Sequence, residues 1–213
     1  MEASVEDLTV TGPSLTQYAA PETATGAILM LHGGKESGQQ IVDDRSASWR
    51  RSAAMGRTIG PEAEAAGAAV WLLRYRLRGW NGGTGRVEDA RWALAQVREQ
   101  VGALPVVLLG HSMGARTSVH VADDPQVRGV VALAPWFPKG EPVGALAGRT
   151  LVAAHGSRDH ITSAQATRAY VERARAAGAD ASYVDMGRVG HYMLRKAAAW
   201  NELALSRSLA LLG

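Results

Sequence analysis

Three side chains in this sequence have the types and the chain order that nucleophilic catalysis requires. Ser112 stands in "GHSMG", with a glycine two residues before it and another two residues after it. Asp159 follows in "HGSRDH", and His191 follows in "GRVGHYML". A serine hydroxyl is a poor nucleophile unless a base takes its proton, and that base needs an acid to orient it. The sequence supplies candidates for all three roles in the order Ser, Asp, His.

The glycines around Ser112 fit a sharp turn from a strand into a helix. An apolar run ends at Gly110, and a helical pattern begins at Met113. Positions two before and two after the serine must be small where strand and helix approach closely, and glycine meets that need. Such a turn exposes the hydroxyl and leaves the Met113 amide free to face an oxyanion. Taken alone, these residues also fit a serine that caps a helix.

The apolar run at residues 27–31 leads into a second glycine-containing loop, "HGGKESG". Glycine lets this backbone come close to a substrate carbonyl. We therefore expect the Gly34 amide to face the nucleophile and to complete an oxyanion hole with Met113. Gly33 is expected to border the substrate, whereas His32 braces the loop.

Apolar segments alternate with helical patterns through most of the chain. Segments typical of strands buried between helix layers lie at residues 27–31, 68–75, 105–110, 127–135 and 149–156, with residues 181–186 as a further candidate. Helices are expected at residues 48–66, 86–101, 113–122, 163–177 and 194–212, with Gly67 and Gly178 as stops. This alternation predicts an α/β fold with a doubly wound, mostly parallel sheet flanked by helices. Residues 5–10 and 15–20 are expected to form an antiparallel pair at its edge.

The predicted strands bring the three candidate residues to one edge of the sheet. Ser112, Asp159 and His191 each follow a predicted strand, and open α/β sheets build their sites at the carboxyl ends of strands. Asp159 by itself also fits an acid at a helix start, and His191 by itself fits a loop histidine on the surface. Their joint occurrence in this order favours a catalytic site.

These motifs together resemble those of the α/β-hydrolase superfamily. The matching segments are "LHGG" at 31–34, "GHSMG" at 110–114, "HGSRD" at 155–159 and "GH" at 190–191, with "RYRLRGWNGGTG" at 74–85 similar to a further loop of the family. The resemblance implies a serine hydrolase in which His191 takes the Ser112 proton and Asp159 orients His191. It implies that water then releases the acid from an acyl-enzyme. Esterases, thioesterases, lipases and peptidases share this set of motifs.

Many members of that superfamily carry a helical cap after the sixth strand. Here only the short segment 135–148 separates that predicted strand from the next one. We therefore expect a minimal or absent cap and an open site. An open site favours a small carboxylesterase or thioesterase over an interfacial lipase.

Several aromatic residues are candidates for substrate contacts. We expect Trp80, Trp136, Phe137 and Tyr192 to line the site, with packing onto the core as the alternative. Arginines beside Trp80, at positions 76 and 78, could meet an acidic or carrier-bound acyl substrate, or could form a solvated rim.

The composition fits one globular domain, which we expect to span residues 1–213. The 213 residues are 46% hydrophobic and 20% charged, with a formal net charge of +3. Basic residues form no long block, so nucleic acid and membrane surfaces are not expected partners. The lack of cysteine excludes disulfides, thiolate metal sites and a cysteine nucleophile. No metal or other cofactor is expected, and the lack of a secretory pattern at the start fits the cytoplasm.

The leading hypothesis is an esterase acting on a small-molecule acyl substrate. A second hypothesis is an acyltransferase, thioesterase or lactone-processing enzyme in a biosynthetic pathway, because the same three residues serve hydrolysis and acyl transfer. A third, from another class, is a non-catalytic ligand-binding protein on the same fold.

Overall fold

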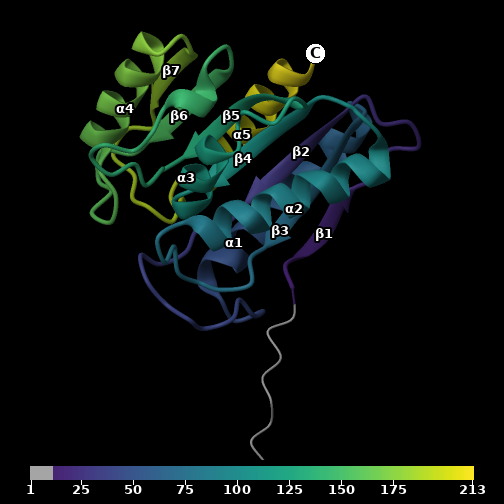
Figure 1. Cartoon of the computed structure of the whole chain (residues 1–213), viewed down its shortest axis with the longest axis horizontal. Helices are drawn as coiled ribbons and strands as arrows, with labels where there is room; N and C mark the ends of the chain where they lie inside the picture. The colour runs from purple at the N-terminus through teal and green to yellow at the C-terminus, as the bar shows by residue number, and fades with distance from the viewer. Residues whose placement is uncertain (1–11) are drawn as a thin grey trace, which may run out of the picture.

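A seven-stranded sheet forms the centre of the described part of the chain, residues 12–213 of the computed structural model. The strands are β1 (Ser14–Ala19), β2 (Gly26–Leu31), β3 (Ala68–Arg74), β4 (Val106–His111), β5 (Val127–Leu133), β6 (Thr150–His155) and β7 (Asp180–Asp185). Their order across the sheet is β1-β3-β2-β4-β5-β6-β7, which runs from the lower right to the upper left of Figure 1. β1 runs antiparallel to β3, and the other neighbouring strands are parallel.

Helices cover both faces of the sheet. α1 (Ala47–Ala65) and α5 (Ala197–Leu212) pack on one face, whereas α2 (Thr84–Val101), α3 (Met113–His120) and α4 (Ala164–Ala176) pack on the other. In Figure 1, α2 passes in front of the strands. The predicted α/β fold with a doubly wound, mostly parallel sheet is confirmed.

The central strand β4 shows why its sequence is apolar without alternation. Leu108 packs into the core on the side of α2, α3 and α4, whereas Leu109 packs into the core on the side of α1 and α5. Successive side chains of a strand point to opposite faces, so a strand covered on both faces needs apolar residues at every position. β4 is therefore held in place by packing on both faces, and the turn that follows it carries Ser112.

The chain reverses its direction of winding at β2. From β2 the chain passes through α1 to its neighbour β3, then returns through α2 on the opposite face to β4, on the other side of β2. The loops after β2 and β4 therefore leave their strands on different sides of the sheet. Open α/β sheets bind ligands at such a switch point, outside the carboxyl ends of the strands. The paired positions Leu31 and Gly110 place both loops at this edge.

Two predicted features differ from the structure. Of the expected antiparallel edge pair, residues 5–10 lie outside the described residues, while the second segment forms β1 and pairs with β3, with Ser14 opposite Arg74. The last helix was expected from residue 194 but begins at Ala197. Met193 and Lys196 adopt positive φ angles of 55° and 57°, and this left-handed backbone cannot continue a right-handed helix.

The segment 135–148 packs against α3 and α4. Phe137 stacks on Tyr170 of α4 with ring centroids 4.0 Å apart. Glu141 is buried and pairs with Arg116 at 2.7 Å and with His120 at 2.5 Å, both on α3. A buried carboxylate requires such partners, and here the partners also tie the segment to the helix that follows Ser112.

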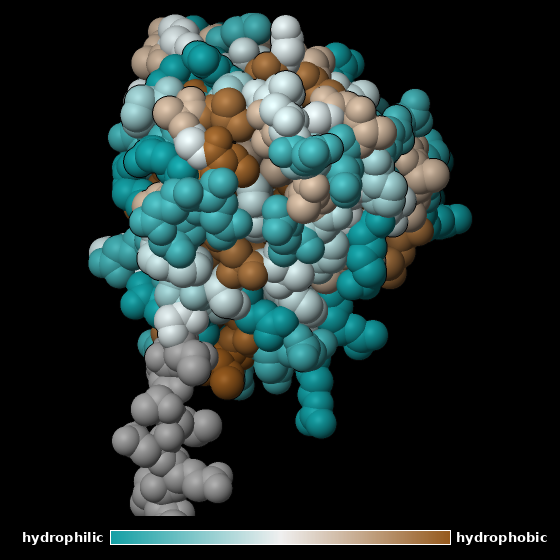
Figure 2. Space-filling model, turned by 90° about the vertical axis from the view of Figure 1, so that its right-hand side faces the viewer, coloured by the Kyte–Doolittle hydropathy of each residue, from teal (hydrophilic) through white to brown (hydrophobic). Residues whose placement is uncertain are grey.

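The surface mixes hydrophilic and apolar residues on the face drawn in Figure 2. Its apolar groups form small patches separated by hydrophilic side chains. Among the helices of residues 12–213, none has the length and apolar character needed to cross a membrane.

Candidate active site

Ser112 lies on a strained turn between β4 and α3. Its φ and ψ angles are 54° and −115°, a conformation that residues with a side chain seldom adopt. A Cβ at Gly110 would overlap the Ala115 backbone, and a Cβ at Gly114 would overlap the Leu31 carbonyl oxygen. The two glycines are therefore required because α3 starts in direct contact with β4 and β2.

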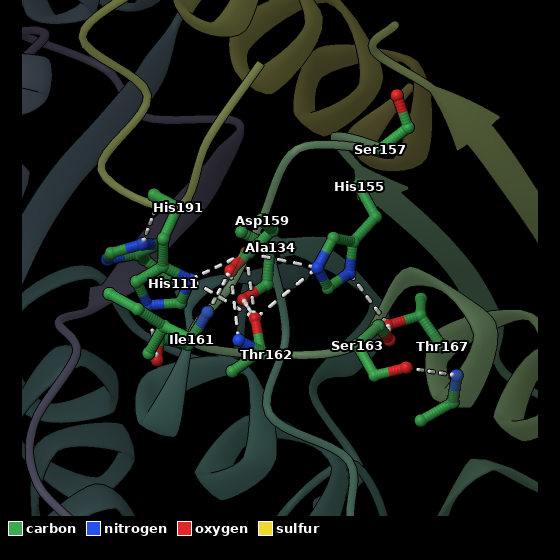
Figure 3. Close-up of polar contacts among 12 residues, drawn as sticks. His111, Ala134, His155, Ser157, Asp159, Ile161, Thr162, Ser163, Thr167 and His191 are labelled. Atoms are coloured by element: carbon green, nitrogen blue, oxygen red, sulfur yellow. Dashed lines mark hydrogen bonds and ion pairs between the residues drawn. The ribbon is translucent and has the colours of Figure 1, made fainter. Parts of the chain in front are cut away.

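The three candidate residues form a continuous chain of hydrogen bonds, part of which Figure 3 shows. The Ser112 hydroxyl lies 3.0 Å from His191 Nε2, and His191 Nδ1 lies 2.7 Å from Asp159 Oδ2. An ionised carboxylate can only accept, so the Nδ1 proton is donated to Asp159, and Nε2 of the neutral imidazole accepts from Ser112. The loops after β4, β6 and β7 thus bring Ser112, Asp159 and His191 into contact.

Asp159 is held in its ionised form by a dense set of donors. Its Oδ1 accepts hydrogen bonds from the backbone amides of Ile161 at 2.8 Å and Thr162 at 2.9 Å. Burial would raise its pKa, but the hydrogen bonds from His155, His191 and the Thr162 amide outweigh that effect and hold the pKa well below its usual range. Asp159 therefore carries a full negative charge where it can stabilise a protonated His191.

Two further residues contact the oxygen of Asp159 that His191 contacts. His155, fully buried, places Nε2 at 3.1 Å from Oδ2 and Nδ1 at 2.8 Å from the Thr167 hydroxyl. The Thr162 hydroxyl donates to the same Oδ2 at 2.9 Å (Figure 3). We did not predict either residue as part of the site. The signals that could have identified them are the place of His155 at the start of the "HGSRD" segment and the closeness of Thr162 to Asp159, three residues after it.

His111, directly before the nucleophile, braces the loop that carries His191. Burial, with a contribution from the neighbouring His191, lowers the pKa of His111 to about 3, so its imidazole is neutral. Its Nε2–H donates to the His191 carbonyl oxygen at 3.1 Å. One nitrogen of a neutral imidazole carries the proton and the other accepts, so this bond fixes the tautomer. This hydrogen bond therefore ties the loop that carries His191 to the end of β4, directly before Ser112.

The glycine loop after β2 lies against Ser112. A Cβ at Gly33 would lie 3.3 Å from the Ser112 Cβ, and a Cβ at Gly34 would lie 2.5 Å from the Met113 side chain and the Arg78 carbonyl oxygen. Among residues 12–213, no group accepts a hydrogen bond from the amide of Gly34 or Met113. Both amides are thus free to donate to a substrate oxygen.

A cavity of about 300 Å³ opens beside Ser112 and His191. Gly33, Gly34 and Tyr192 are among its lining residues. Residues of the loops after β2 and β3 form another part of its wall, together with Ile161. No residue of the segment 135–148 lines it.

Trp80, Trp136 and Phe137 lie outside this cavity, in contrast to the expectation. The Arg116 guanidinium lies 4.2 Å from the Trp80 ring and 4.5 Å from the Trp136 ring, and the two rings meet edge to face. Phe137 is held by its stack on Tyr170. Trp80 and Trp136 pack around the partly buried Arg116, which pairs with the buried Glu141, because contact with a cation and burial of ring area both stabilise the rings there.

Among residues 12–213, no three His, Asp or Glu side chains are arranged so that they could hold a metal ion together. The histidines of the site are instead occupied by contacts to the carboxylate, hydroxyl and carbonyl groups described above.

Comparison with known proteins agrees with this architecture. A model of the alpha/beta hydrolase family matches residues 28–210. An alpha-beta serine hydrolase homologue from Coxiella burnetii is 17% identical, with a TM-score of 0.67 over 92% of this chain and 90% of its own. A serine hydrolase without lid from Xanthomonas campestris is 18% identical, with a TM-score of 0.66 over 92% and 88%. A monoacylglycerol lipase from Paleococcus ferrophilus is 14% identical, with a TM-score of 0.67 over 94% and 100%.

No curated protein matches the sequence significantly. The family model nevertheless covers most of the chain, and the solved structures share its fold. The chain therefore belongs to the alpha/beta hydrolase family.

Proposed function

We propose that this protein is a serine esterase that cleaves carboxylic esters or thioesters through an acyl-enzyme on Ser112. The observation that carries the proposal is the unbroken contact from the Ser112 hydroxyl through His191 to Asp159. This arrangement can remove the serine proton while the hydroxyl attacks a carbonyl carbon.

In the acylation step, Ser112 Oγ forms a bond to the acyl carbon and its proton passes to His191 Nε2. Asp159 stabilises the resulting imidazolium through the Nδ1 hydrogen bond. The carbonyl oxygen becomes an oxyanion, which the free amides of Gly34 and Met113 stabilise by hydrogen bonds. The bond to the leaving alcohol or thiol then breaks, and the leaving group takes the proton from Nε2.

In the deacylation step, His191 takes a proton from a water molecule as the water oxygen attacks the acyl carbon. The same amides stabilise the second oxyanion. Ser112 leaves with the proton from Nε2, and the carboxylic acid is released. The cavity of about 300 Å³ fits a small acyl group, since it lies at the lower end of ligand-pocket volumes.

Acyl transfer is the second candidate function, because the cavity is open to acceptors other than water. No residue of the segment 135–148 lines the cavity. An alcohol acceptor would replace water in the deacylation step and yield a new ester. Product analysis with and without an added alcohol distinguishes transfer from hydrolysis.

A fluorophosphonate serine probe tests whether Ser112 is activated. We expect a covalent adduct on the peptide that contains Ser112, found by mass spectrometry, and loss of labelling in Ser112→Ala. Turnover of p-nitrophenyl esters should fall by about 10⁴-fold or more in this variant, since the nucleophile is lost.

Ser157→Ala is the matched control. Ser157 is exposed and donates to the Gly187 carbonyl oxygen rather than to a histidine. This variant should label and turn over like the wild-type protein. A folded wild-type protein that takes up no probe would instead favour the non-catalytic ligand-binding protein.

A further inference from the structure

The Lys and Arg side chains that line the cavity beside Ser112 are not matched by acidic side chains in its lining. Its lining includes the cations Lys35, Arg45 and Arg78, and it includes no Asp or Glu side chain among the described residues. Tyr192 and Ile161, from the loops after β7 and β6, add apolar surface. A cleft lined by charges of one sign concentrates ligands of the opposite sign.

Backbone hydrogen bonds join the two loops that carry Lys35 and Arg78. The Lys35 amide donates to the Arg78 carbonyl oxygen at 2.8 Å, and the Arg78 amide donates to the Gln40 carbonyl oxygen at 2.9 Å. The loops after β2 and β3 are thus joined into one wall. Lys35 directly follows Gly34 and lines the same cavity as Gly34 and Ser112.

Acidic neighbours neutralise only part of this charge. Arg78 Nη2 pairs with Asp43 at 2.7 Å, and Arg78 Nε donates to the Ile41 carbonyl oxygen at 2.9 Å. Asp43 also accepts from the Ser46 hydroxyl at 2.8 Å. An arginine has five N–H donors, so Arg78 keeps donors that these contacts do not use.

The other two cations have no acidic partner. Within residues 12–213, neither the Lys35 ammonium nor the Arg45 guanidinium forms an ion pair. This differs from the other arginines of the same loop region, since Arg74 pairs with Asp44 and Arg76 pairs with Asp89. Two cations without an acidic partner therefore line the cavity beside Ser112.

We infer that the substrates are small acyl esters or thioesters that carry a second, anionic group, such as a carboxylate. The carbonyl binds at Ser112, and the carboxylate binds Lys35, Arg45 and the free donors of Arg78. Charge-assisted hydrogen bonds of this kind are stronger than neutral ones. This inference rests on the proposed esterase function, and it adds a requirement for negative charge at the far end of the acyl group.

Two p-nitrophenyl esters of equal chain length test the inference. The hexanoate ester ends in a methyl group, and the adipate monoester ends in a carboxylate. We expect kcat/KM for the adipate ester to exceed that for the hexanoate ester by about tenfold or more at low ionic strength. The ratio should fall in 0.5 M NaCl, because salt screens exposed charges.

Variants assign the preference to the cavity wall. The double variant Lys35→Gln, Arg45→Gln should lower the adipate-to-hexanoate ratio toward one. Arg50→Gln is the matched control, because Arg50 is exposed but does not line the cavity, and it should keep the wild-type ratio. A wild-type ratio of one or below, or a ratio that the double variant leaves unchanged, would overturn the inference while leaving the esterase intact.

Labelling of Ser112 provides a second measurement that does not depend on turnover. Adipate should slow fluorophosphonate labelling in a concentration-dependent manner, whereas 1,6-hexanediol should not. Equal protection by both compounds would count against the anionic substrate. The absence of both labelling and turnover would instead refute the proposed function, and the inference with it.

Discussion

At the scale of single residues, the site depends on how many groups contact one carboxylate. Asp159 Oδ2 is shared by His191, His155 and the Thr162 hydroxyl, while Oδ1 accepts two backbone amides. A carboxylate with this many donors has a fixed orientation as well as a fixed charge. His191 is therefore presented to Ser112 in a single orientation.

Replacing Asp159 by asparagine tests this role. The neutral side chain cannot stabilise a charged His191, and its NH₂ group cannot accept from Nδ1. We expect kcat/KM of Asp159→Asn on p-nitrophenyl esters to fall by roughly 10²- to 10⁴-fold, a loss no greater than that of His191→Ala. Asp123→Asn is the control, because Asp123 is exposed and pairs only with Arg91. Activity of Asp159→Asn near that of wild type would place the acid on another strand.

At the scale of elements, the backbone of α3 lies so close to the end of β2 that the turn between β4 and α3 leaves no room for a side chain at Gly114. α3 begins where its first turn contacts the end of β2, and Gly114 lies at that contact. Any side chain there must displace main-chain atoms, because the neighbouring group is a carbonyl of a central strand. The close approach of α3 to β2 after Ser112 therefore requires glycine at this position.

Gly114→Ala should destabilise the protein by about 3 kcal/mol or more, because the new Cβ overlaps the Leu31 carbonyl oxygen. Gly114→Val should be more severe and should abolish labelling of Ser112. Urea unfolding followed by circular dichroism measures the loss. Gly144→Ala is the matched control, since nothing lies within 4 Å of a Cβ built there. Equal unfolding midpoints for the two alanine variants would disprove the overlap.

The segment 135–148 is a short connection that stands in place of a helical cap. Its contacts are to α3 and α4, through the Glu141–Arg116 pair and the stack of Phe137 on Tyr170. The segment is held down beside the site, so the cavity is formed by the loops after β2, β3, β6 and β7. This arrangement explains why Trp136 and Phe137, which belong to this segment, do not line the cavity.

At the scale of the whole molecule, the charge states of buried groups link stability to pH. Burial lowers the pKa of His32 to about 4 and that of His111 to about 3, with smaller contributions from nearby positive groups. The unfolded chain binds protons at these histidines near pH 6.5, whereas the folded protein does not. Their contribution to stability is therefore complete above pH 6.5 and is lost as the pH falls below it. The lowered pKa values of Asp159 and Glu141 act in the same direction at lower pH.

We expect the free energy of unfolding to fall by about 1.4 kcal/mol per pH unit for each of these two histidines between pH 6.5 and pH 4. Urea unfolding at a series of pH values measures this slope. His111→Asn should reduce the slope by about 1.4 kcal/mol per pH unit, the contribution of one histidine. This reduction is expected whatever the effect of the substitution on stability at neutral pH. His160→Asn, at an exposed histidine, should leave the slope unchanged. A wild-type slope in His111→Asn would show that His111 is not held neutral by burial.

Much of the fold and the meeting of Ser112, Asp159 and His191 could be predicted from the sequence because both depend on local patterns. Apolar runs that lack alternation mark strands covered on both faces, and β4 has such a run. The glycines beside Ser112 mark a turn that no other residue permits. The loop positions of Asp159 and His191 follow from the strands before them, since parallel strands end at one edge.

The tertiary structure alone decided which other side chains meet at the site. Trp80 and Trp136 turn toward Arg116, and His155 reaches Asp159 through the buried interior. The cations at the cavity come from the loops after β2 and β3, which backbone hydrogen bonds and the Arg78–Asp43 ion pair join together. A sequence specifies where a chain turns, because the cause lies within a few residues. The direction of a side chain depends on partners far along the chain, which only the packed structure brings together.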